Sequence, residues 1–131
     1  MWRDAGAEVM ELPVQRHDEL LASTSHLPHV VAYALVNYLA SRDEADALFD
    51  LAAGGFYDFT RIASSDAVMW RDICLTNRDA ITKALKGFEE WVARMREAVE
   101  TGDGERLQDW FEHARDTRDR GLQRKADNQE P

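Results

Sequence analysis

The sequence predicts an all-α domain, and three observations lead to that prediction. The chain has 131 residues, 44% hydrophobic and 31% charged, enough for one domain with an apolar core and a solvated surface. Apolar residues recur at spacings of three and four along most of the chain, which is the period of an amphipathic helix. No stretch alternates strand-like and helix-like segments, so a parallel α/β sheet is not expected.

The first third of the chain predicts a short extended segment followed by helix. Residues 5–12 (AGAEVMEL) suit a short strand or extended segment ahead of Pro13. Helical spacing begins at Val14, and Pro28 either kinks this helix or starts a new one. Residues 29–40 are apolar on nearly every side, which is typical of a central helix covered by neighbouring helices or by a partner chain.

Two short helices are predicted next. Residues 43–53 form an amphipathic helix that we expect to end at Gly54-Gly55, a pair that readily takes positive φ. The following segment has three apolar residues on one side: Phe56, Phe59 and Ile62. Ser65-Asp66 then provides an N-cap for a further helix.

The second half predicts two long helices that pack as a pair. Asn77 is placed to cap the first, which carries a heptad-like apolar seam: Ile81, Leu85, Phe88, Val92, Met95 and Val99. Residues 101–104 break this helix. The last helix contains Leu107, Trp110, Phe111 and Ala114, and we expect it to end before a polar tail that begins at Arg118.

Charge and cysteine content exclude several classes of protein. The net charge is −9 and the basic residues near the C-terminus alternate with acidic ones, so neither nucleic acid nor an anionic membrane is an expected partner. Cys74 is the only cysteine, which fits a reducing, cytoplasmic location. The charged N-terminus is unlike a signal peptide, and the uncharged stretch 20–41 contains polar residues, so we interpret it as a buried helix.

A few residues are candidates for chemistry. His26 and His29 share one helical face, and a metal pair, a core or capping role, and a polar pocket for an anion all stay open; no third ligand is evident, so we predict no metal site. Gly54-Gly55 and Arg61 could bind a carboxylate through backbone N–H groups and a guanidinium, or be a flexible turn and a surface arginine. Trp70 could be a core anchor or a pocket wall.

One glycine motif is rejected as a nucleotide site. GDGERL, residues 102–107, starts like a dinucleotide-binding loop, but Leu107 stands at the third glycine and a helix precedes it. We expect the chain to bind no nucleotide by itself.

Three motifs in a fixed order carry a family resemblance: HDELLASTSHLPH (17–29), GGFYDFTRIASSD (54–66) and MWRDI (69–73). Together they resemble the C-terminal half of prephenate and cyclohexadienyl (arogenate) dehydrogenases, from about residue 2 to about residue 120. The resemblance implies an all-helical domain that forms the dimer and closes over the substrate. It also implies that residues 1–13 are the end of a nucleotide domain or a linker, 14–120 the helical domain and 121–131 a polar tail.

The resemblance further implies roles for single residues. In this family a Rossmann domain binds NAD or NADP and carries the catalytic histidine, so no catalytic residue and no cofactor are expected in this chain. The implied substrate-binding residues are His26, His29, Arg61, Trp70, Gly55 and Tyr57. Arg61 would hold the ring carboxylate of prephenate with His29 beside it, and Asp18 would join an ion network across the dimer. Tyr57 replaces a lysine of some relatives, a difference that favours arogenate.

The function implied is the oxidative decarboxylation of prephenate to 4-hydroxyphenylpyruvate in tyrosine, and hence aromatic amino acid, biosynthesis. This chain would be the homodimeric substrate-binding part of a cytoplasmic NAD(P)-dependent oxidoreductase, inactive alone. The alternative is a non-enzymatic helical homodimerisation module. A helical chorismate mutase is less favoured. Such an enzyme needs several cationic residues in one helical pocket, and only Arg61 is convincingly placed for that role.

Overall fold

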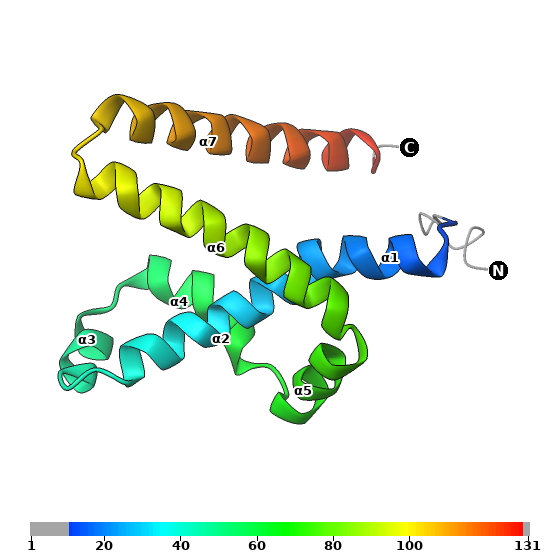
Figure 1. Ribbon diagram of the computed structural model, residues 1–131, viewed down its shortest axis with the longest axis horizontal. Coiled ribbons are helices and arrows are strands. Elements are labelled where there is room, and N and C mark those ends of the chain that lie inside the picture. The colour runs from blue at the N-terminus through cyan, green and yellow to red at the C-terminus, as the bar shows by residue number, and fades with distance from the viewer. Residues whose placement is uncertain (1–10, 130–131) are drawn as a thin grey trace. The chain divides into compact units, whose positions relative to one another are not determined.

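The computed structural model describes residues 11–129, and all regular structure in that range is helical, as predicted (Figure 1). The predicted extended segment over residues 5–12 lies almost entirely outside the described residues. The chain divides into two compact units, residues 1–86 and 87–131, each of which is described by itself. Among the helices of residues 11–129, none has the length and apolar character needed to cross a membrane.

The helices follow the predicted order. The first unit contains α1 (Val14–Leu21), the π-helical η2 (Ala22–His26), α2 (Leu27–Ala40), α3 (Ala45–Leu51), α4 (Gly54–Thr60), the 3-10 helix η3 (Arg61–Ser64) and α5 (Ala67–Thr76). Helix α6 (Arg78–Glu100) begins in this unit and continues into the second, which also contains α7 (Gly104–Asp127).

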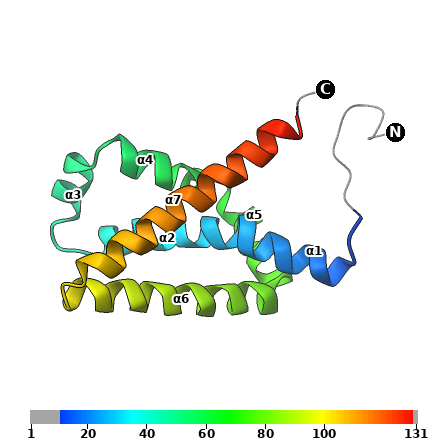
Figure 2. The same ribbon diagram turned by 90° about the horizontal axis from the view of Figure 1, so that it is seen from above.

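Pro28 changes the type of helix without interrupting it. α1, η2 and α2 form one helical run (Figure 2). Pro28 has no N–H to donate to the carbonyl of Thr24, and its ring would clash with that carbonyl in a regular α-helix. The π-helical turn just before it accommodates the proline. The hydroxyl of Thr24 donates to the carbonyl of Leu20 at 2.8 Å.

Helix α2 is the central helix of the first unit, and it packs against α3, α4 and η3. Ala32 is fully buried, and the Tyr33 hydroxyl donates to the carbonyl of Ser65 at 2.9 Å, which joins α2 to the end of η3. Tyr38 is exposed near the C-terminal end of the helix. The chain therefore covers its apolar central helix only in part.

The starts of α4 and α5 differ in how well the sequence predicts them. Gly54-Gly55 does not end a helix with positive φ; the pair forms the first turn of α4, and Gly102 (φ 66°) is the glycine with positive φ among residues 11–129. Asp66, in contrast, caps α5 as predicted, because its carboxylate accepts from Met69 N at 2.8 Å.

In the second unit the end of α6 pairs with α7 through a tight turn. Asp103 caps α7 by accepting from Arg106 N at 3.1 Å, and the Trp91 and Trp110 rings meet edge to face at 5.5 Å. Helix α7 does not end before Arg118 as expected but continues to Asp127. Arginine, glutamine and lysine are good helix formers, and basic residues in the last turn suit the helix dipole.

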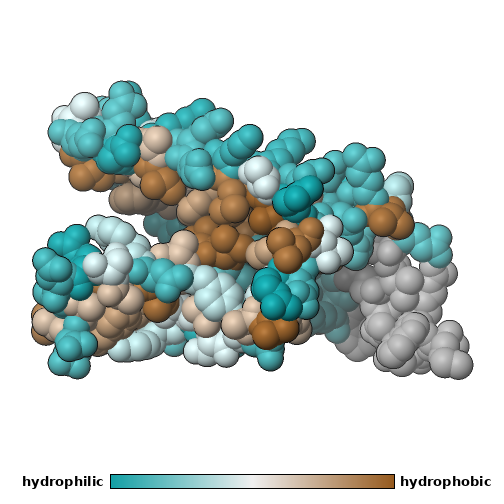
Figure 3. Space-filling model, turned by 60° about the horizontal axis from the view of Figure 1, so that its bottom comes forward, coloured by the Kyte–Doolittle hydropathy of each residue, from teal (hydrophilic) through white to brown (hydrophobic). Residues whose placement is uncertain are grey.

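The predicted apolar seam of α6 is only partly covered from Phe88 onward. Ala98 is buried, but three seam residues stay exposed: Phe88 (38%), Val92 (50%) and Val99 (65%). Phe111 and Leu122 on α7 are exposed as well. Figure 3 shows large hydrophobic residues on the surface of the chain. An apolar surface of this kind is typical of a protein that buries it against a partner.

Candidate functional site

Two histidines and a tryptophan form an aromatic cluster in the first unit. His26 ends the π-helical turn, His29 lies in the first turn of α2, and Trp70 lies in the first turns of α5. The His29 ring stacks on Trp70 with centroids 3.6 Å apart, and the His26 ring meets Trp70 edge to face at 5.9 Å. The prediction that both histidines share one face is confirmed, because both rings contact the same indole.

Trp70 holds the cluster together from the interior. The residue is only 8% exposed, so it is an anchor of the packing. Its indole N–H is buried and has no hydrogen-bond partner among residues 11–129. A buried donor without a partner costs about 1–3 kcal/mol. Such a donor is available to a ligand acceptor that reaches it.

The backbone fixes the tautomer of His29. Its Nδ1 lies 2.8 Å from the carbonyl oxygen of Ser25. A carbonyl oxygen can only accept, so Nδ1 carries the proton and donates. In the neutral ring, Nε2 is then an acceptor.

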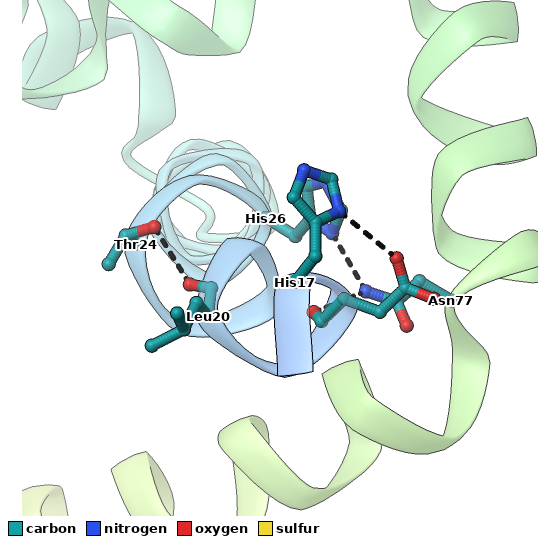
Figure 4. Close-up of polar contacts among 6 residues, drawn as sticks. His17, Leu20, Thr24, His26 and Asn77 are labelled. Carbon is teal, nitrogen blue, oxygen red and sulfur yellow. Dashed lines mark hydrogen bonds and ion pairs between the residues drawn. The ribbon is translucent and has the colours of Figure 1, made fainter. Parts of the chain in front are cut away.

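His26 is held by a residue from the junction of α5 and α6. The Asn77 side-chain nitrogen lies 3.3 Å from His26 Nδ1 and donates to the carbonyl oxygen of Asp18 at 2.9 Å (Figure 4). Burial lowers the pKa of His26 below its ordinary value of 6.5, the positive charge that His29 can carry lowers it further, and the Asp18 carboxylate opposes both effects. His26 is therefore predominantly neutral at pH 7.

Sequence reasoning did not predict this role for Asn77. Asn77 lies at the start of α6, where the sequence placed it, but only as a helix cap. Its partner His26 is 51 positions away in the chain, and no local pattern links the two residues. Only the fold brings them together.

A cleft opens beside this cluster. It has a volume of about 390 Å³ and is lined by Asp18, His26, Met69, Asp72, Ile73, Thr76 and Asn77. A larger groove of about 720 Å³ shares Asp18, Thr76 and Asn77 with it and extends between α1 and the start of α6. The cleft is open to solvent and His26 lines it, so a small molecule can reach His26.

Arg61 lies apart from the aromatic cluster. It is exposed at the first position of η3, and it makes no hydrogen bond or ion pair with any other residue in the range 11–129. Eight other arginines are paired with acidic side chains: Arg16, Arg42, Arg71, Arg78, Arg96, Arg106, Arg115 and Arg118. Because η3 packs on α2, Arg61 and His29 are on adjoining elements.

Of the other predicted site residues, Asp18 lines the cleft beside His26, whereas Tyr57 and Gly55 are not joined to the cluster. The Tyr57 hydroxyl donates to the carbonyl of Phe49 at 2.9 Å, and no contact with His26, His29 or Trp70 is found in the described part of the chain. Gly55 lies in the first turn of α4, where an added Cβ would meet no atom within 4 Å. The Asp18 carboxylate lies 3.5 Å from His17, in an exposed pair.

The chain shows neither a dinucleotide loop nor a metal cluster in the part that the structure describes. Gly102 and Gly104 belong to the turn between two helices, and Asp103 uses its carboxylate to cap α7, so these residues do not fit a dinucleotide phosphate site. Within residues 11–129, no group of three or more His, Cys, Asp or Glu side chains is placed to hold a metal ion.

Comparison with known proteins agrees with the fold and motifs. Residues 13–113 match the family described as "Prephenate dehydrogenase, dimerization domain". The chain is 40% identical to prephenate dehydrogenase of Bacillus subtilis over 121 residues, covering 89% of this chain and 32% of that protein. It is 33% identical to cyclohexadienyl dehydrogenase of Zymomonas mobilis over 119 residues, covering 89% of this chain and 41% of that protein.

A solved structure of a relative has the same fold as this chain. The Aquifex aeolicus prephenate dehydrogenase, crystallised with hydroxyphenyl propionate and NAD+, superposes with a TM-score of 0.82 at 41% identity, covering 89% of this chain and 41% of that one. The chain thus spans less than half the length of each of these relatives. With a family match over residues 13–113 and a shared fold, the chain belongs to the prephenate dehydrogenase dimerization-domain family.

Proposed function

We propose that this chain is the substrate-binding and dimerisation domain of an NAD(P)-dependent prephenate or arogenate dehydrogenase of tyrosine biosynthesis. The observation that carries the proposal is that Arg61, on an element packed against the helix of His29, pairs with no acidic side chain among residues 11–129. Asp58 stands three residues before Arg61 yet does not pair with it. A guanidinium that pairs with no acidic side chain among residues 11–129 is suited to a carboxylate on a ring-containing ligand.

Different side chains of the site bind different parts of the substrate. Arg61 binds the ring carboxylate with His29 beside it, while Trp70 and the histidines bound the site for the substrate ring. A chain of charge −9 repels an anionic substrate, so local positive or neutral donors must converge where it binds. A guanidinium bound to the ring carboxylate also orients the group that leaves as CO2 when a hydride leaves ring C4 and the ring becomes aromatic.

The hydride acceptor belongs to a separate nucleotide-binding domain, since Gly102 and Gly104, in the turn before α7, do not fit a dinucleotide phosphate site. We therefore expect the chain alone to reduce neither NAD nor NADP when prephenate is added. Catalysis requires it to be joined to such a domain.

The proposal includes a homodimer. The exposed seam residues of α6 and the apolar residues of α7 become the interface with a second copy, as the family description suggests. Asp18 then contributes to an ion network across that interface. Gly55 and Tyr57, which make no contact with the aromatic cluster in one chain, complete a substrate site in the dimer.

Binding of 4-hydroxyphenylpyruvate tests the proposal directly. We expect the indole N–H signal of Trp70 and the imidazole signals of His29 to shift on titration of the isotope-labelled chain. Arg61→Ala should abolish most of the shift, and Arg71→Ala, which removes an arginine already paired with Asp72 at 2.8 Å, should not. A dimer whose signals stay unchanged with both 4-hydroxyphenylpyruvate and prephenate would instead support the non-enzymatic dimerisation module.

A further inference from the structure

Asn77 occupies a position from which it controls the chemistry of His26. We propose that Asn77 is a positioning residue that holds His26 as its Nε2–H tautomer, so that the ring presents a neutral hydrogen-bond donor to the ligand. The part of this inference that concerns the ligand rests on the proposed function.

The first step is the orientation of the Asn77 amide. Its side-chain nitrogen is 2.9 Å from the backbone carbonyl oxygen of Asp18. Two acceptors cannot face each other at that distance, so the NH2 group, and not the amide oxygen, must point to Asp18. The orientation of the amide follows from a partner that can only accept.

The second step is the proton on His26. The same NH2 group lies 3.3 Å from His26 Nδ1, and its second hydrogen is available for that contact. A donor facing Nδ1 requires a lone pair there, so the proton of the neutral ring is on Nε2. Asn77 thus ties α1 to His26 and selects one of two otherwise similar tautomers.

The third step is the contrast with His29. The Ser25 carbonyl holds His29 in the opposite tautomer, with the proton on Nδ1. The two neighbouring imidazoles therefore present different groups: His26 a donor at Nε2 and His29 an acceptor at Nε2. Among the described residues, the contact with Asn77 is the hydrogen bond that the structure gives to the His26 ring.

The surroundings of His26 support a neutral ring. The ionisable groups near it are His17 and Asp18 from α1, His29 from α2 and Asp72 from α5, which lines the same cleft. Burial and His29 lower the pKa of His26, and Asp18 raises it. A neutral ring carries one proton and donates from Nε2 only in its Nε2–H tautomer, which the contact with Asn77 favours.

The wild-type chain provides the first test. Long-range 15N–1H correlation spectra of the labelled chain distinguish the two tautomers of each histidine above pH 7. We expect His26 to be mainly Nε2–H and His29, the internal reference, to be mainly Nδ1–H. A His26 ring that is mainly Nδ1–H, or an even mixture, would overturn the proposal whatever any variant does.

Two variants test whether Asn77 sets the tautomer of His26 or only stabilises the fold. Asn77→Asp offers only acceptors, so it should move the His26 proton to Nδ1 and raise the His26 pKa; Asn77→Ala should leave a mixture of tautomers. Both variants lose the bond to Asp18 and should be less stable, so stability alone decides nothing. If either variant folds and keeps the wild-type tautomer of His26, the proposal is wrong.

Ligand binding then distinguishes this inference from the proposed function. We expect about 10-fold weaker binding of 4-hydroxyphenylpyruvate to Asn77→Asp, the loss of one buried hydrogen bond, with the His29 tautomer unchanged. Wild-type binding with His26 as Nδ1–H would sustain the proposed function and refute the role of Asn77. An Nε2–H ring in a chain that binds no ligand would refute the proposed function and leave the tautomer assignment intact.

Discussion

The imidazole of His29 stacks on the indole of Trp70 with ring centroids 3.6 Å apart and planes inclined by only 16°. The two residues come from different helices, and the stack fixes α2 against α5. It also leaves the Trp70 N–H buried and unpaired among the described residues. One contact thus serves both the packing of the first unit and the candidate site.

Replacing Trp70 should separate these two contributions. Trp70→Ala leaves a cavity where an indole with only 8% exposure was packed, so we expect the free energy of unfolding to fall by about 3–5 kcal/mol in urea denaturation. Trp70→Phe keeps an aromatic ring against His29 and removes the unpaired N–H. It should cost clearly less stability and still weaken 4-hydroxyphenylpyruvate binding; equal losses of stability in the two variants would contradict the buried stack.

Arg61 should contribute to substrate binding and little to folding. In an enzyme made by joining this chain to the nucleotide-binding part of the Bacillus subtilis relative, Arg61→Ala should raise KM about 30-fold or more, and Arg61→Lys should recover only part of the loss. Arg71→Ala is the matched control and should keep a normal KM. A lowered melting temperature of Arg61→Ala with an unchanged KM would show that Arg61 is structural.

His26 should make stability depend on pH in a defined direction. Its pKa is lowered in the folded chain, chiefly by burial, so the unfolded chain binds the proton more tightly. The stability that the neutral ring contributes is fully present above pH 6.5 and is lost as pH falls through 6.5 towards the folded-state pKa. Denaturation curves between pH 8 and about 5 should show this decline.

The matching variants define the contribution of His26. The free energy of unfolding of His26→Gln should decline less than that of the wild type over the same pH range, because the variant lacks the titrating ring. His113→Gln, which changes an exposed histidine of α7, should follow the wild type. If the His26→Gln and wild-type curves have the same slope, the ring is not desolvated as the structure implies.

The exposed seam of α6 should make the chain a dimer. Light scattering at micromolar concentration should give twice the chain mass of 15.0 kDa. Val92→Asp places a charge on a half-exposed seam residue and should shift the protein to the monomer. Lys86→Asp, outside the seam on the same helix, changes the charge more and should leave the dimer intact; a wild-type monomer would refute the interface.

Local sequence patterns were sufficient to predict most of the helices. The spacing of apolar residues and the Asp66 cap act within one or two turns, so residues near each other in the chain determine them. The same holds for His26 and His29, which a three-residue spacing places on one face. The polar composition after Arg118, however, predicts a tail, and α7 continues to Asp127, because most residues of this stretch, such as arginine, lysine, glutamine and alanine, favour helix.

Tertiary structure decided the features that depend on distant partners. Whether Gly54-Gly55 ends or begins a helix depends on the path of the chain around α2, since glycine permits both. The burial of Trp70 and the contact of Asn77 with His26 join residues from separate helices, and no spacing in the sequence encodes such contacts. The amino-acid sequence by itself therefore determined the helices and which side chains share a face, because these depend on neighbours one turn away. Tertiary packing alone determined which nitrogen of the His26 ring carries the proton, because the amide of Asn77 that contacts this ring lies 51 positions away in the chain.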